Sequence, residues 1–286
     1  MNDRDTVLVT GATGTTGSRV VARLAALGHP VRAAARRPAG APAVPFDWYD
    51  PATHPGALHG ADRLYLVPPP GDPDPAAVML PFLERARAAG TRRAVLLSSS
   101  ALPAGGPGVG RVHAALPGLF DAWTVLRPSW FMQNFTGGHP HAQDIRERGV
   151  LTTATGGGRV GFVDADDIAA VAVRALTAEP ALPAGDLVLT GPQALSYDEV
   201  AAVVSEVTGR PVRHRAIGHE ALRDRLAAGM PAEFAALLAG LDRAIAGGAE
   251  DRVTDTVERL TGRPPRAFRA HAQAHWSGGA GRIPTP

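Results

Sequence analysis

The chain has 286 residues, of which 45% are hydrophobic and 20% charged, with a formal net charge of +2. This length can bury a sizeable core, and the composition is that of a globular protein, not of a disordered one. The sequence contains no cysteine, and all 29 of its basic residues are arginine. Disulfides, thiolate catalysis, lysine Schiff bases and Tyr-x-x-x-Lys catalytic pairs are therefore excluded.

Charge and hydropathy also restrict the partners. The isoelectric point is high, about 9.6, because arginine alone supplies the basic charge. The arginines are dispersed among acids and do not form the basic run of a nucleic-acid-binding protein. No apolar run reaches transmembrane length, and no segment resembles a signal peptide. We expect a cytoplasmic protein, monomeric or homodimeric, with a small-molecule substrate and no nucleic-acid or membrane partner.

Short apolar runs alternate with helical patterns through the first two thirds of the chain. Helices ending at a C′ glycine are expected between strands, at 18–28 and 76–90. This alternation predicts an α/β fold, a doubly wound and mostly parallel sheet of the NAD(P)-binding Rossmann type. The expected strands are 6–10, 30–35, 43–47, 63–68, 93–99, 123–128 and 186–191.

The second half of the sequence changes character. Residues 164–179 predict a helix that returns to the sheet, with Asp164 as its N-cap, and 195–209 begins with a capping box of Ser196 and Glu199. From about residue 192 onward the pattern is helical. We expect a dinucleotide-binding domain of residues 1–135, to which 161–191 return, and a smaller, largely helical substrate-binding lobe of 136–160 and 192–286. The glycine-rich stretches 103–108 and 155–159 are expected to be loops, either mobile connections or active-site lids.

The run TGATGTTG, residues 10–17, lies between the first expected strand and the first expected helix. In such a turn the first glycine permits the tight turn, the second lets the backbone approach a pyrophosphate, and the third lets the helix pack on the sheet. The alternative is that the glycines serve only to turn the chain. The helix N-terminus adds free N–H groups for the phosphates. The expected cofactor residues here are Gly11, Thr13, Gly14, Thr15, Thr16 and Gly17.

The end of the second strand reads AAARRP, where an NAD-binding protein would carry an acid for the ribose hydroxyl. Arg36 and Arg37 stand there instead, and guanidinium suits a 2′-phosphate. This predicts NADPH, with NADH less favoured, unless both arginines are ordinary surface residues. Asp47 and Trp48, after the third strand, are expected to border the adenine, although Trp48 could simply pack in the core.

Several motifs carry a resemblance to a known family: TGATGTTG, VLLSS (95–99), GRVHAAL (110–116), TVLRPSWFMQNF (124–135), FVDADDIAAVA (162–172) and LTGRPPRAFRAHAQAHW (260–276). With them the sequence resembles the NmrA-like atypical short-chain dehydrogenases/reductases, and within these the ergot-alkaloid reductases of the festuclavine and agroclavine dehydrogenase type. The resemblance implies that strands four to six line the nicotinamide through Val67, Pro68, Ser98, Ser99 and Pro128.

The same resemblance places the substrate side in the segment after strand six. The residues it implies are Ser129, Trp130, Phe131, Met132 and Asn134. Core packing is an open alternative for Phe131 and Met132. For Asn134 the alternative is that its side chain hydrogen-bonds the backbone. A departure from typical short-chain dehydrogenases is plain, because no tyrosine is followed by a lysine four residues on. The candidates for a proton donor are His113, which follows strand five, and more weakly Ser99 and Tyr65.

These features predict an NADPH-dependent oxidoreductase that transfers a hydride to a small organic acceptor in specialised metabolism. An imine, an iminium or a conjugated C=C makes less demand for a strong acid than a carbonyl does. The alternatives are a non-catalytic NADP(H) sensor, a quinone or azo reductase, and an isomerase or cyclase without net redox change. No metal is expected: the spacing of His139 and His141 could hold one, but a loop is the favoured interpretation.

Overall fold

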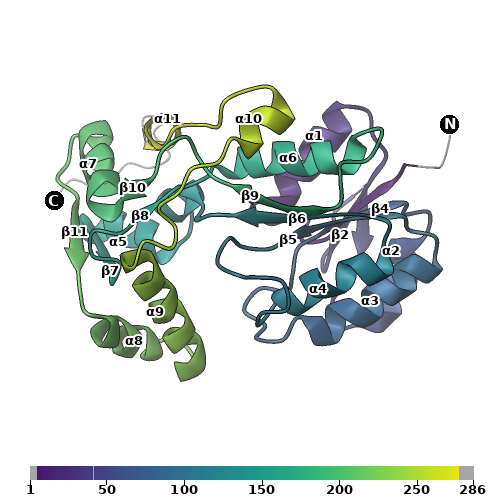
Figure 1. The fold of residues 1–286 in the computed structure, drawn as a ribbon, viewed down its shortest axis with the longest axis horizontal. Helices are drawn as coiled ribbons and strands as arrows, with labels where there is room; N and C mark the ends of the chain where they lie inside the picture. The colour runs from purple at the N-terminus through teal and green to yellow at the C-terminus, as the bar shows by residue number, and fades with distance from the viewer. Residues whose placement is uncertain (1–4, 41, 277–286) are drawn as a thin grey trace. The chain divides into compact units, whose positions relative to one another are not determined.

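The computed structural model describes residues 5–40 and 42–276, which form two compact units (Figure 1). The sheet unit takes in the chain up to Pro128, together with Ala165–Leu189 and Arg259–Gly262. The second unit takes in Ser129–Asp164, Thr190–Glu258 and the described residues from Arg263 on. Each unit has a buried apolar core of its own.

Within the described residues, the sheet unit contains a seven-stranded sheet in which every neighbouring pair is parallel. All seven expected strands are present, so the predicted doubly wound fold is confirmed. The strand order reverses between β1 and β4, and in such sheets ligands bind at the carboxyl ends of the strands beside that point. In spatial order the strands are β3 (Ala43–Pro45), β2 (Val31–Ala35), β1 (Val7–Val9), β4 (Arg63–Leu66), β5 (Arg93–Leu97), β6 (Ala122–Pro128) and β9 (Gly185–Leu189).

Helices cover both faces of this sheet (Figure 1). For this reason β1 and β4 are buried at every residue, including Arg63 at the start of β4. Gly28 and Gly90 have φ of +76° and +97°, which confirms them as glycines that end helices. One face carries α1 (Gly17–Ala26) and α6 (Ala165–Thr177); the other carries η1 (Pro51–Thr53), α2 (His54–Leu58), α3 (Ala76–Ala88) and α4 (Gly110–Leu119).

The second unit combines helices with two short strand pairs. After residue 192 the chain is mostly helical, and the short strands β10 and β11, which the sequence pattern did not reveal, also lie there. The capping box is confirmed: the Ser196 hydroxyl accepts from Glu199 N–H at 3.2 Å, and Ser196 N–H donates to Glu199 at 2.8 Å. The strand pairs are β7 (Val150–Thr153) with β11 (Arg213–Ala216), parallel, and β8 (Arg159–Val160) with β10 (Leu195–Ser196), antiparallel.

The helices of the second unit follow from local signals. The predicted loop at residues 139–141 was wrong, because His139 is the N-cap of α5 and accepts a hydrogen bond from His141 N–H at 3.2 Å. Helix α10 (Thr256–Thr261) contains residues of both units. The others are η2 (Met132–Phe135), α5 (Pro140–Arg148), α7 (Tyr197–Thr208), α8 (His219–Ala227), α9 (Ala232–Ala246) and α11 (Phe268–Trp276).

The glycine-rich stretch at 155–159 has a packing role. A Cβ on Gly158 would lie 2.2 Å from the Ile245 carbonyl oxygen at the end of α9, so only glycine permits this approach. Among the described residues, no helix combines the length and the hydropathy that a membrane crossing would need.

Candidate functional site

The three glycines of the first turn are needed for different reasons. Gly11 has a φ of +59°, and a Cβ there would meet the Val67 side chain at 2.9 Å. A Cβ on Gly17 would lie 2.2 Å from the Gly11 carbonyl oxygen, so helix α1 can begin here only with glycine. The predicted turning role of Gly11 is confirmed, and Gly17 is required by its close approach to the backbone of the turn. Gly14 is different, because its added Cβ would meet only the Gly11 carbonyl oxygen, at 3.2 Å.

Gly14 instead faces a cavity of about 310 Å³ at the carboxyl ends of the first four strands. Its lining segments directly follow β1, β2, β3 and β4, on both sides of the point where the strand order reverses. Because Gly14 lines this space without a side chain, a ligand there could approach its backbone closely. The lining residues are Gly11, Thr13, Gly14, Ala34, Ala35, Arg36, Phe46, Asp47, Trp48, Tyr49, Val67, Pro68, Pro69 and Pro70.

Hydrogen bonds fix the walls of this cavity. Val67 N–H donates to the Thr10 hydroxyl at 2.7 Å, which joins the ends of β1 and β4. The Trp48 indole donates to the Val67 carbonyl at 3.2 Å and packs edge-on against Phe46, so Trp48 both lines the cavity and belongs to the core. Asp47 accepts from Tyr49 N–H at 3.0 Å, in a turn that sets its carboxylate.

Arg36 is the cation of this cavity. It is exposed at the end of β2 and lines the space, whereas its exposed neighbour Arg37 does not. Among the described residues, no hydrogen bond or ion pair engages the Arg36 guanidinium. The cavity therefore presents a free bidentate donor beside a glycine turn, which is the donor set that a phosphorylated ribose and a pyrophosphate require.

The other predicted cofactor residues lie outside this cavity. Thr15 is exposed, and its carbonyl accepts from Arg19 at 2.7 Å; Thr16 is 3% exposed at the start of α1. Pro128 ends β6, and its carbonyl accepts from Ser100 N–H at 2.9 Å. Ser98 follows β5, and its buried hydroxyl has no hydrogen-bond partner within the described part of the chain. An orphaned polar atom there is compatible with a bound group that would satisfy it.

The three proton-donor candidates differ in their surroundings. His113 lies in α4, 6% exposed, with its ring centroid 6.2 Å from that of Trp123. Its Nδ1 is buried without a partner among the described residues, and burial lowers the pKa of its imidazole. Tyr65 is fully buried in β4, which raises the pKa of its phenol above its usual range. The Ser99 hydroxyl accepts from Ala101 N–H at 3.3 Å.

Arg127 is a residue that sequence reasoning missed. Its guanidinium donates to the Ser100 carbonyl at 2.9 Å and to Asp186 on β9 at 2.6 Å. It therefore holds the chain where it leaves β5, and it lowers the pKa of the Asp186 carboxyl. Its place within LRPSW was visible, but this bridge to β9 was not.

A cavity of about 210 Å³ lies in the second unit. Of the predicted substrate residues, Trp130 and Asn134 line it, and Met132 belongs to the core. Phe131 pairs with Val163 through the backbone, and the Ser129 hydroxyl lies 3.5 Å from Glu250. Sequence reasoning missed most of the lining, which comprises Trp130, Asn134, His139, Pro140, His141, Asp144, Thr152, Tyr197, Leu222, Arg225, Leu226, Met230, Leu238, Leu241 and Asp242.

A buried chain of hydrogen bonds elsewhere in the second unit has the order of a hydrolase triad. The Asp164 carboxylate lies 2.9 Å from His271 Nδ1, and His271 Nε2 lies 2.9 Å from the Thr136 hydroxyl. Thr136 is only 3% exposed, so its hydroxyl cannot meet a substrate. We interpret this series of hydrogen bonds as a structural contact that holds α11 in place.

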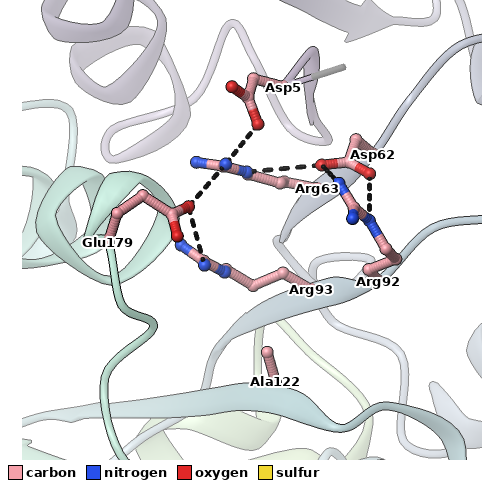
Figure 2. A pocket seen from close by; sticks show the side chains of 7 residues that line it. All are labelled: Asp5, Asp62, Arg63, Arg92, Arg93, Ala122 and Glu179. Atoms are coloured by element: carbon pink, nitrogen blue, oxygen red, sulfur yellow. Dashed lines mark hydrogen bonds and ion pairs between the residues drawn. The ribbon is translucent and has the colours of Figure 1, made fainter.

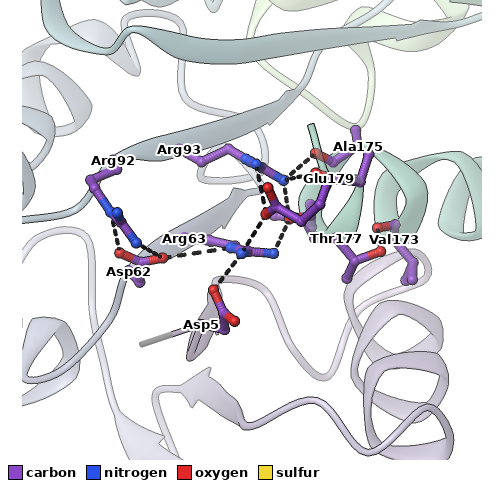
Figure 3. A network of polar contacts seen from close by, with 11 residues as sticks. Asp5, Asp62, Arg63, Arg92, Arg93, Val173, Ala175, Thr177 and Glu179 are labelled. Atoms are coloured by element: carbon purple, nitrogen blue, oxygen red, sulfur yellow. Dashed lines mark hydrogen bonds and ion pairs between the residues drawn. The ribbon is translucent and has the colours of Figure 1, made fainter. Parts of the chain in front are cut away.

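A third cavity, of about 360 Å³, lies at the amino ends of β4, β5 and β6 (Figure 2). Arg63 and Arg93, both buried, reach from β4 and β5 to the carboxyl end of α6 (Figure 3). Both donate to the Leu176 carbonyl, at 2.8 and 2.6 Å, and both pair with Glu179. Arg63 also pairs with Asp5, and Asp62 with Arg92. The three arginines and three acids of this cavity balance in charge. We interpret them as a clamp that holds α6 to the sheet, at the edge opposite the one where such sheets bind ligands.

Comparison with known proteins places the chain in a family. It matches the NmrA-like family over residues 119–258, and the NAD dependent epimerase/dehydratase family over residues 7–61. The uncharacterized oxidoreductase YesF of Bacillus subtilis is 45% identical over 279 residues, which are 96% of each chain. The chain belongs to the NmrA-like family.

Among the relatives of this NmrA-like protein, agroclavine dehydrogenase of Claviceps fusiformis is 41% identical over 78% of this chain and 80% of its own length. The NADPH-dependent quinone oxidoreductase QOR2 of Escherichia coli, solved with NADPH, shares the fold, with a TM-score of 0.81 over 95% of this chain and 100% of that chain at 24% identity. The NmrA-like protein is thus a reductase, an enzyme of the oxidoreductase class.

Proposed function

We propose that this protein is an NADPH-dependent reductase that transfers a hydride to an imine, an iminium or a conjugated C=C of a small organic molecule in specialised metabolism. The observation that carries the cofactor part is the cavity at the carboxyl ends of β1 to β4. Gly14 lines it without a side chain, and the Arg36 guanidinium has no hydrogen bond or ion pair with any described residue.

The residues proposed to hold NADPH follow from this cavity. Gly11, Thr13 and Gly14 would contact the pyrophosphate, and Arg36 the 2′-phosphate, with Asp47 and Trp48 beside the adenine. The Ser98 hydroxyl, which is orphaned, and Pro128 remain the proposed nicotinamide contacts. When bound, NADPH supplies the hydride.

We infer the class of substrate from the surroundings of two proton-donor candidates among the described residues, Tyr65 and His113. Tyr65 is buried and retains its proton more strongly than a free phenol does. His113 is held largely neutral near pH 7, because burial lowers its pKa below the ordinary value. A carbonyl needs a proton at the developing alkoxide, whereas an iminium accepts a hydride without one. We therefore favour an acceptor that does not draw a proton from the protein, and propose that the residues contribute positioning and exclusion of water.

We further propose a division of labour between the units. The sheet unit, with its glycine turn, would bind the cofactor, and the second unit would supply substrate contacts through Trp130 and Asn134. The agroclavine dehydrogenase relative supports an acceptor of the class that the ergot-alkaloid reductases use.

Calorimetry with NADPH and with NADH tests the cofactor, and stopped-flow absorbance of NADPH with a panel of acceptors tests the reaction. The panel contains N-methyl-3,4-dihydroisoquinolinium, an enone, a quinone and an azo dye. We expect NADPH to bind more tightly than NADH and the iminium to be reduced fastest. If neither dinucleotide binds, the proposal is wrong. Tight NADPH binding without hydride transfer would favour a sensor, and fastest reduction of the quinone or the dye would favour a quinone or azo reductase.

A further inference from the structure

The cavity of the second unit combines an apolar wall with an isolated carboxylate. The apolar side chains come from α8, α9 and the turn between them: Leu222, Leu226, Met230, Leu238 and Leu241. Asp242, on α9, is the acid next to this wall. Its Oδ2 accepts from Ala154 N–H at 2.7 Å, a backbone donor that orients the carboxylate without neutralising it.

The other charged groups of the lining are compensated or neutral. Asp144 pairs with Arg225 at 3.2 Å and also with Arg148. Burial lowers the pKa of His141 to about 3 and lowers that of His139 as well, so neither carries a positive charge near neutral pH. Within the described part of the chain, Asp242 has no ion-pair partner. When ionised, Asp242 therefore adds a negative charge to this cavity that no ion pair of the described residues compensates.

Asp242 is half-buried, and a carboxylate that is partly removed from water beside an apolar wall is stabilised when a cation joins it. Aromatic residues also line the cavity, Trp130 and Tyr197, and aromatic rings attract cations. A volume of about 210 Å³ suits a molecule of one or two rings. The combination matches an organic ammonium or iminium ion with a small apolar body.

We propose that Asp242 makes this cavity a site for the cationic nitrogen of a small apolar substrate, so that the protein selects charged amines and iminium ions over neutral molecules of the same shape. The inference rests on the proposed function, because it takes this cavity as the substrate site. It adds the residue that sets charge selectivity, and it favours the iminium over the neutral enone and quinone.

The protonation of Asp242 allows a second test of the proposal, through the pH dependence of cation binding. Burial raises the pKa of this carboxyl, although the Ala154 hydrogen bond and the nearby His214 and His219 lower it. A cation would bind the charged form, so binding should weaken as the pH falls through this raised pKa and the carboxylate takes up a proton. The other titratable or charged groups on neighbouring elements are Tyr197, Asp198, His139, His141, Asp144 and Arg225.

Calorimetry without any dinucleotide tests the proposal. N-methyl-3,4-dihydroisoquinolinium has no proton to lose and carries its positive charge in neutral and acidic solution, and isochroman is an uncharged bicycle of similar shape. We expect the wild-type protein to bind the cation at least about tenfold more tightly than isochroman. Asp242→Asn, which retains an acceptor for Ala154, should bring the two affinities to within about twofold of one another. Asp224→Asn removes an exposed charge of the same unit and should preserve the selectivity.

A measurement on the wild-type protein alone guards against a variant that fails to fold. Affinity for the permanent cation, followed from about pH 8 to about pH 4, should fall at a pH above the ordinary carboxyl pKa, while isochroman affinity stays flat. Equal affinity for both compounds, or unchanged cation binding in Asp242→Asn, would overturn the proposal. Because no cofactor is present, this result is separate from whether NADPH binds or hydride is transferred.

Discussion

Gly17 lies so close to Gly11 that a Cβ on Gly17 would stand 2.2 Å from the Gly11 carbonyl oxygen. The same test on Gly14 gives only one contact, at 3.2 Å, to that same oxygen. The first and third glycines of the turn are thus required by the fold, whereas we attribute the second to a ligand in the cavity that it lines.

Two alanine variants separate these requirements. Gly17→Ala should lower the free energy of unfolding by about 3 kcal/mol, because the backbone must move to admit the methyl group. Gly14→Ala should retain most of the stability and lose NADPH affinity by about tenfold or more, because its methyl group enters the cofactor cavity. Urea unfolding and calorimetry measure the two effects. Equal loss of stability in both variants would contradict the division.

Arg36 and Arg37 form a second matched pair, since only Arg36 lines the cavity. Arg36→Met should weaken NADPH binding by about tenfold or more and leave NADH binding nearly unchanged, because a charge-assisted contact to the 2′-phosphate is lost. Arg37→Met should change neither by more than about twofold. The ratio of the two dissociation constants is the measurement. If Arg37→Met has the larger effect, the assignment of the phosphate contact to Arg36 is wrong.

The parts of the fold that could be predicted depend on local physics. The turn at Gly11, the helix ends at Gly28 and Gly90, and the capping box at Ser196 each satisfy a requirement of neighbouring backbone, so a short stretch of sequence reveals them. The position of Arg36 at the end of β2 follows from a spacing rule of the same kind.

Other features could not be predicted, for equally physical reasons. Strand β11 reads RHRA and is mostly exposed, so it lacks the apolar run that marks the strands of the main sheet. At His139 the signal for a helix was Pro140 at the first helical position, but histidine is not a usual N-cap.

Most of the residues that line the cavity of the second unit could not be predicted, because they are far apart in the sequence. Asp242 meets Ala154 across 88 residues of sequence, and nothing near Asp242 marks it as different from a surface acid of an amphipathic helix. Arg63 meets Glu179 across 116 residues. Such pairs depend on how the helices and strands pack together, and this packing cannot be read from a single sequence.

The clamp on α6 predicts a contrast between adjacent arginines. Arg93 is 8% exposed and donates to the Leu176 and Ala178 carbonyls at 2.6 and 3.0 Å, whereas the Arg92 side chain is 66% exposed and pairs with Asp62 at the surface. Arg93→Met should lower the unfolding free energy by about 3–5 kcal/mol, because helix carbonyls and Glu179 lose a buried donor. Arg92→Met should have a much smaller effect, because surface pairs are screened by solvent. Urea unfolding measures the unfolding free energy of both variants. Equal losses of unfolding free energy would show that Arg93 does not clamp the helix.

His141 predicts how stability depends on pH. Its ring packs parallel to that of Phe135, with centroids 5.8 Å apart, and burial lowers its pKa from about 6.5 to about 3. Between these values the unfolded chain binds a proton that the folded protein excludes, so this residue makes stability fall as the pH drops below about 6.5, by up to about 1.4 kcal/mol per pH unit.

His141→Gln should therefore flatten the dependence of unfolding free energy on pH between about pH 5 and pH 7, when compared with the wild-type protein by urea unfolding. The matched control is His59→Gln, because the His59 side chain is exposed and is not packed in the core. A wild-type slope in the His141→Gln variant would mean that the buried imidazole takes up its proton without unfolding. In that case the cavity beside Asp242 would gain a positive charge in mild acid, and cation binding there would weaken for a second reason.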